Sequence, residues 1–168
     1  MLLDAPWAFG ASPEDDRALG AAELASYLRD EQKALFAVER PPSTGRPMSP
    51  PSAGNGAELV AAAGIVRVAN AKSAHRSKVW GVYVDPEYRR LGLGRRVVSA
   101  VVELARQWPG VDFVDLAVSE NSPEARRLYE GLGFKAWGRE PEAIDCNGRR
   151  YDEIYMTLRL TPKVGSSL

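Results

Sequence analysis

The sequence contains almost no cysteine or histidine, and this scarcity excludes several kinds of site. Its 168 residues include one cysteine, Cys146, and one histidine, His75. A single cysteine cannot form a disulfide within the chain, and these two residues cannot supply the ligands of a Cys/His zinc site. We therefore expect no metal cofactor, and so little cysteine suits a reducing compartment.

Net charge and long apolar segments are also missing. The 22 lysines and arginines balance the 22 aspartates and glutamates, so no overall basic field exists to hold a nucleic-acid backbone. No segment approaches the ~18 apolar residues that a transmembrane helix needs. Asp4 and Pro6 interrupt the start of the chain, which lacks the basic segment of a secretory signal. The sequence thus predicts a cytoplasmic protein that binds neither nucleic acid nor a membrane.

What is present is an ordinary globular composition, because 45% of the residues are hydrophobic and the length is that of one domain. Apolar and β-branched residues predict strands at 33–39, 58–70, 78–84, 112–118, 134–138 and 151–160. Helical spacing and end signals predict helices at 12–30, 91–108 and 122–131. This order predicts an α/β (α+β) fold in a single domain of residues 1–168, with helices flanking one mixed sheet.

Two connections have a distinctive composition. Residues 40–56 contain five prolines and three glycines among serine, threonine and asparagine, which predicts a flexible hairpin loop. Asn147 and Gly148 separate the last two strands and predict a tight hairpin turn.

The most informative segment runs from Val82 to Arg96, where a strand leads into a glycine-bearing turn that opens a helix. Such a turn directs free backbone N–H groups and the positive helix end at one point. Glycines at 92 and 94 let a ligand approach the main chain closely. A phosphate or pyrophosphate site is therefore expected. It is neither a Walker A loop, since Arg95 follows Gly94, nor a dinucleotide fingerprint, since Val97 replaces its third glycine.

Two motifs in this chain resemble those of the GNAT superfamily of N-acetyltransferases. Arg89, Gly92 and Gly94 match the signature (Gln/Arg)-x-x-Gly-x-(Gly/Ala), whose turn holds the pyrophosphate of acetyl-CoA in that family. The segment 125–134 is similar to the second motif, Ala-x-x-Leu-Tyr-x-x-x-Gly-Phe. The resemblance covers residues 24–160.

The resemblance implies acetyl-CoA as co-substrate, with its pantetheine arm between two splayed parallel strands. The implied binding residues fall into three groups along the chain: the main chain of Val82, Tyr83 and Val84 for pantetheine; Arg89, Arg90, Leu91, Gly92, Leu93, Gly94 and Arg95 for the pyrophosphate; and Asn121 or Ser122 beside the pantetheine. Ser122 has an alternative interpretation as the cap of the helix that begins at Pro123.

Tyr129 is the predicted catalytic residue. The resemblance implies that its hydroxyl protonates the departing CoA thiolate, and a phenol of pKa ~10 is close enough to a thiol of pKa ~8.5 for useful proton transfer. The alternative is that Tyr129 only packs, with its hydroxyl at the surface.

The general base is left open by the sequence. Positions at which family members carry a glutamate hold Ala117 on one strand and Trp80 and Gly81 on another. A water relay is one possibility, and the acidic or basic candidates that remain are Asp115, His75, Asp152 and Glu153.

The predicted function is transfer of an acetyl group from acetyl-CoA to a primary amine, directly and within a ternary complex. The acceptor, a small molecule or a protein N-terminus, stays open, and Cys146 is not expected to act as a nucleophile. The alternative is a CoA-binding regulatory or degenerate module without efficient catalysis.

Family members usually begin with an edge strand and a helix, of which Met1–Asp4 resembles only the end. Either the sheet lacks its first strand or the chain starts upstream. A missing edge strand exposes backbone groups that a homodimer would cover.

Overall fold

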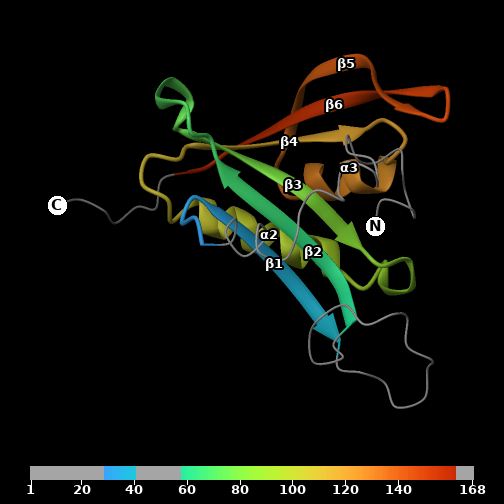
Figure 1. The fold of residues 1–168 in the computed structure, drawn as a ribbon, viewed down its shortest axis with the longest axis horizontal. Coiled ribbons are helices and arrows are strands. Elements are labelled where there is room, and N and C mark those ends of the chain that lie inside the picture. The colour runs from blue at the N-terminus through green and yellow to red at the C-terminus, as the bar shows by residue number, and fades with distance from the viewer. Residues whose placement is uncertain (1–28, 41–57, 162–168) are drawn as a thin grey trace.

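A six-stranded mixed sheet organises the computed structural model, which describes residues 29–40 and 58–161 (Figure 1). The helix expected at 12–30, apart from its last residues, and the loop expected at 40–56, apart from Arg40, lie outside this part, as does Met1–Asp4. The strands are β1 (Lys33–Arg40), β2 (Glu58–Arg67), β3 (Arg76–Val84), β4 (Phe113–Ser119), β5 (Lys135–Cys146) and β6 (Arg149–Arg159). Their order is β1-β2-β3-β4-β6-β5, and only the pair β3–β4 is parallel. The expected mixed sheet is confirmed.

Helix α2 (Leu93–Ala105) covers one face of the sheet. Its apolar stripe, including Val98 and Val101, packs on fully buried Ala61, Ala63 and Ile65 of β2. The helix ends three residues before the expected position. Gln107 and Trp108 donate to carbonyls three residues earlier, which is the tighter 3-10 pattern in which α-helices often end.

The second helix and the hairpin follow the predicted positions closely. Helix α3 (Pro123–Glu130) packs against the same core through Tyr129. Ser122 stands at its N-cap, but the interpretation as a capping side chain is wrong, because its backbone (ψ 61°) is not extended and its hydroxyl makes no capping bond. Asn147 (φ 54°) and Gly148 (φ 77°) form the expected turn, with both residues left-handed as a type I′ turn requires.

The two parallel strands separate soon after they begin to pair. Pairing between β3 and β4 covers three positions and ends at Lys78 opposite Asp115, after which the strands diverge (Figure 1). A β-bulge at Gly81 (φ 59°) sets two residues of β3 against one of β2, which bends β3. We call the opening between residues 79–84 of β3 and 116–119 of β4 the wedge.

An ion pair holds the closed end of the wedge. The Arg76 guanidinium donates to both carboxylate oxygens of Asp115, at 2.6 Å from Nε and 2.5 Å from Nη2, and more weakly to Thr157 Oγ1 at 3.4 Å. The same guanidinium stacks over the ring of Phe113, 4.7 Å from its centroid. Three strands are therefore tied together at the last rung before they part.

We expect Asp115→Ala to lower the free energy of unfolding by about 1–3 kcal/mol, because a half-buried guanidinium loses its charged partner. Urea denaturation measures the change. The control is Glu103→Ala, which removes an exposed ion pair with Arg106 on α2 and should alter stability by less than about 0.5 kcal/mol. Equal costs for the two variants would show that the pair does not hold the sheet.

Candidate active site

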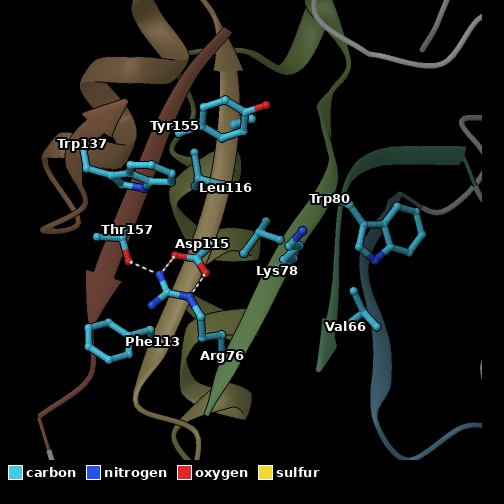
Figure 2. Close-up of a pocket in the computed structure, with 12 residues that line it drawn as sticks. Val66, Arg76, Lys78, Trp80, Phe113, Asp115, Leu116, Trp137, Tyr155 and Thr157 are labelled. Atoms are coloured by element: carbon cyan, nitrogen blue, oxygen red, sulfur yellow. Dashed lines mark hydrogen bonds and ion pairs between the residues drawn. The ribbon is translucent and has the colours of Figure 1, made fainter. Parts of the chain in front are cut away.

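A cavity of about 940 Å³ opens on the sheet face opposite α2 (Figure 2). The polar groups of Arg76, Asp115 and Thr157 meet in the cavity next to the closed end of the wedge. Trp137 and Tyr155 line one side of the cavity. The lining residues come from five strands: Val66, Arg76, Lys78, Val79, Trp80, Phe113, Asp115, Leu116, Ala117, Trp137, Tyr155 and Thr157.

Trp80 needs the glycine beside it. Its indole lies against Gly64 of β2, where an added Cβ would stand 2.2 Å from the ring. From the sequence, Trp80 was expected only as a position without a base, and Trp137 and Tyr155 were not predicted. The available signal was the period-two spacing of Arg76, Lys78 and Trp80, which puts three large side chains on one face.

The bulge at Gly81 shifts the alternation of β3 by one residue. Beyond it Val82 and Val84 pack against the core, whereas Trp80 before it faces the cavity. The other edge of Val82, Tyr83 and Val84 faces the wedge, since β3 pairs there with β4 only as far as Lys78. Val82 and Val84 therefore direct their side chains to the core while the main chain of the segment borders the wedge.

The turn after β3 is built from short-range bonds. Asp85 accepts from the N–H of Glu87 at 2.8 Å and starts a 3-10 turn at Pro86–Tyr88. Arg90 (φ 65°) and Gly92 (φ 78°) then take left-handed conformations before α2 begins.

Among residues 29–40 and 58–161, the first turn of α2 presents backbone donors that lie before the helical ladder. The first helical bond runs from Arg96 N to Gly92 O at 3.1 Å, so the N–H groups of Leu93, Gly94 and Arg95 precede the hydrogen-bonded ladder. They carry the positive end of the helix dipole.

The two glycines of the motif stand in different surroundings. A Cβ on Gly92 would meet nothing within 4 Å, which leaves room for a ligand. Gly94 is buried, and its Cβ would lie 3.0 Å from Leu128 and 3.4 Å from Val84. Gly94 therefore also serves close packing of α2 on α3 and β3, a role that the sequence analysis missed.

The arginines divide between structure and surface. Arg89 Nε donates to the carbonyl of Val84 at 3.2 Å, and Arg95 Nη2 donates to that of Gly131 at 3.3 Å. Arg90 and Leu91 are exposed next to them. Positive charge thus surrounds the start of α2 at the open end of the wedge.

Asn121 and Ser122 follow the end of β4, on the other side of the wedge. The N–H of Asn121 donates to Ser119 Oγ at 3.3 Å, and the N–H of Ser122 donates to the Ser119 carbonyl at 2.9 Å. These bonds turn the chain from β4 into α3.

Tyr129 lies in the core, 6% exposed, with its ring edge-on to Phe134 at 6.0 Å. Burial raises the pKa of its phenol to about 12, so the hydroxyl is protonated at neutral pH. The ring packs in the core, and the tyrosine is buried rather than at the surface, where the alternative interpretation expected its hydroxyl.

Within residues 29–40 and 58–161, no group of three or more His, Cys, Asp or Glu side chains is placed to hold a metal ion. No helix in that same part of the chain is both long enough and apolar enough to span a bilayer.

Similar sequences point to one kind of enzyme. The chain is 47% identical over 60 residues to mycothiol acetyltransferase of Thermobispora bispora. The aligned segment makes up 36% of this chain and 20% of that protein. It is 26% identical over 77 residues to the L-amino acid N-acetyltransferase AaaT of Escherichia coli, covering 46% and 48%. The chain therefore spans about half or less of the length of these curated relatives.

Solved structures share the fold. The ribosomal-protein-alanine N-acetyltransferase of Brucella melitensis superposes with a TM-score of 0.65 at 19% identity, over 83% of this chain and 76% of that one. YncA of Salmonella typhimurium, solved with acetyl-CoA, gives 0.57 at 22% identity over 66% of each. The family model described as acetyltransferase (GNAT) family matches residues 10–134, which is most of the sequence. With the divergent parallel strands and the glycine turn between them, this match shows that the chain belongs to the acetyltransferase (GNAT) family.

Proposed function

We propose that residues 1–168 form a single acetyltransferase domain that moves an acetyl group from acetyl-CoA to a primary amine, by direct transfer in a ternary complex. The wedge carries this proposal. The wedge opens toward the start of α2 on one face of the sheet and toward the cavity on the other face. Two substrates entering from opposite faces would therefore meet between β3 and β4.

The helix side suits acetyl-CoA. The open edge of Val82–Val84 can pair with the amides of pantetheine as a neighbouring strand would, since β3 has lost β4 there. The N–H groups of Leu93, Gly94 and Arg95 suit the pyrophosphate, and Arg89 and Arg90 add positive charge. We place Asn121 or Ser122 beside the pantetheine on the β4 side.

The cavity suits the acceptor, a small amine or a protein N-terminus. The similar proteins from E. coli and B. melitensis carry names that specify an L-amino acid and a ribosomal-protein alanine, both of which offer a primary amine. We propose a cytoplasmic location, where acetyl-CoA is available, and a homodimer in which the edge at β1 is covered by a second copy.

The transfer makes one bond and breaks one. The amine nitrogen attacks the thioester carbonyl carbon, a C–N bond forms, and the C–S bond breaks with the electron pair on sulfur. Tyr129 gives its proton to that sulfur and regains one from the new amide nitrogen. Since burial makes the phenolate costly, the two proton movements must be closely coupled.

A CoA-binding module without efficient catalysis is the second candidate. It is favoured by Ala117 and Trp80, which line the cavity where family members carry a glutamate. Thiol release from acetyl-CoA, measured with L-methionine, spermidine and an alanine-initiated peptide, separates the two. Tight CoA binding without release above background supports the module and contradicts the enzyme.

We expect acetyl-CoA at 100 times its Kd to stabilise the parent protein by about 2.7 kcal/mol. Gly92→Val should remove most of this stabilisation, because a branched side chain enters the space left for the phosphates. Thermal unfolding with and without acetyl-CoA measures the effect. The control is Gly148→Val in the hairpin turn, which has nearly the same φ (77° against 78°) and equally open surroundings. Unchanged binding by Gly92→Val would overturn the phosphate site.

Tyr129→Phe should lower kcat by about 10²–10⁴-fold, because it removes the proton donor and leaves the ring packing intact. Affinity for acetyl-CoA should not change. Tyr151→Phe, at a buried tyrosine in the β5–β6 hairpin, is the matched control. An undiminished kcat in an assay limited by chemistry would exclude Tyr129 from the mechanism.

A further inference from the structure

The proposed reaction needs a neutral amine, but the strands that form the wedge offer no carboxylate where family members carry one. Ala117 is exposed on β4, and Trp80 and Gly81 occupy the corresponding part of β3. A primary amine is largely protonated near pH 7, so a base must come from elsewhere. The structure separates the four candidates that the sequence left open.

Asp115 and His75 lie at the closed end of the wedge. Both oxygens of Asp115 accept from Arg76, so the carboxylate is committed to the ion pair. His75 precedes β3, and its ring lies edge-on against Phe113 with centroids 5.9 Å apart. His75 and Asp115 both precede the segments 79–84 and 116–119 that border the wedge.

Asp152 belongs to the other face of β6. It pairs with Arg139 and accepts from the N–H of Glu142 at 2.9 Å. That N–H, followed by Arg139, holds the pKa of the Asp152 carboxyl below its ordinary value. A carboxylate stabilised in this way is a weak base.

Glu153 lies on the cavity face, two residues before Tyr155 on β6. Its register partner on β4 is Ser119, and the partner of Tyr155 is Ala117. Glu153 is therefore the diagonal neighbour of Ala117, with backbones ~7–8 Å apart, which a glutamate side chain can span. Ala117 projects only a methyl group, so no longer side chain at that position of β4 separates the Glu153 carboxylate from the wedge.

The surroundings of Glu153 differ from those of the other carboxylates. Glu140 of β5 is its direct partner in register and accepts a hydrogen bond from the Tyr155 hydroxyl, while β4 presents the neutral Ser119. Within the described part of the chain Glu153 forms no ion pair. Burial first, and then the charge of Glu140, raises the pKa of the half-buried Glu153 carboxyl.

We propose that Glu153 is the general base, and that its carboxylate takes one proton from the acceptor ammonium within the wedge, beside Ala117. The inference rests on the proposed function, since it supplies the neutral nitrogen that attacks the thioester. Glu153 then releases the proton to solvent. The remaining surplus proton of the nitrogen replaces the one that Tyr129 gives to sulfur, so that amide, CoA thiol and one proton leave.

The test is the pH dependence of kcat/KM for Glu153→Gln, measured with whichever amine of the three-member panel the parent acetylates. At pH 7 we expect a loss of about 10²-fold or more. The loss should shrink as the pH approaches the pKa of the amine, because an amine that is already neutral needs no base. For the parent, kcat/KM should fall as the pH drops through the raised pKa of Glu153, and this limb should be absent from the variant.

The control is Glu142→Gln, an exposed carboxylate of the same hairpin that pairs with Arg150. It should leave the whole profile unchanged. If Glu153→Gln keeps parental rates, or loses the same factor at every pH as a structural defect would, the assignment is wrong. If the parent itself releases no thiol, the proposed function fails instead.

A second measurement needs no acceptor. NMR titration of the labelled Glu153 side-chain carboxyl should give a pKa above the ordinary ~4.3 of glutamate. Glu140→Gln should lower that pKa by removing the neighbouring negative charge. An ordinary pKa, or one that Glu140→Gln does not move, would overturn the proposed environment of the base.

Discussion

The separation of β3 from β4 is the constraint on which the rest of the site depends. Two adjacent strands normally satisfy each other's N–H and C=O groups along their whole length. Here the ladder stops after three rungs, the Arg76–Asp115 pair holds the last one, and the bulge at Gly81 bends β3 away. The edge of β3 that β4 no longer pairs with is suited to an extended ligand with amides of its own.

The same separation gives the two faces of the sheet different surroundings at the wedge. On the helix face, the start of α2 and its arginines meet the open end of the wedge, and Gly94 lets α2, α3 and β3 approach closely enough to form it. On the other face, the side chains of five strands surround the cavity. Because both faces converge on one gap, the two substrates of the proposed transfer would meet there without passing through the core.

Local features of the site could be predicted from the sequence, whereas features that depend on register could not. The glycine turn, the start of α2 and the Asn147-Gly148 hairpin are encoded by residues a few positions apart, and all three are found. The cavity unites residues that are up to 91 positions apart, from Val66 to Thr157. The bulge that turns Trp80 and Val82 to opposite faces has no sequence signal beyond a single glycine.

Asp115 and Glu153 lie on the same face of the sheet, and their surroundings give the two carboxylates different roles, one structural and one in the proposed reaction. Asp115 has a guanidinium on both oxygens, so its charge is neutralised in place and its role is to tie strands together. Glu153 has Glu140 as its neighbour and is partly shielded from water. Both conditions destabilise the charged carboxylate and raise the pKa of Glu153, so it binds a proton more readily. In an antiparallel pair a side chain one strand away can reach toward a small residue, so the proposed base on β6 can act beside Ala117 without any movement of the backbone. The position of the base in space, rather than its position in the chain, is what the chemistry constrains.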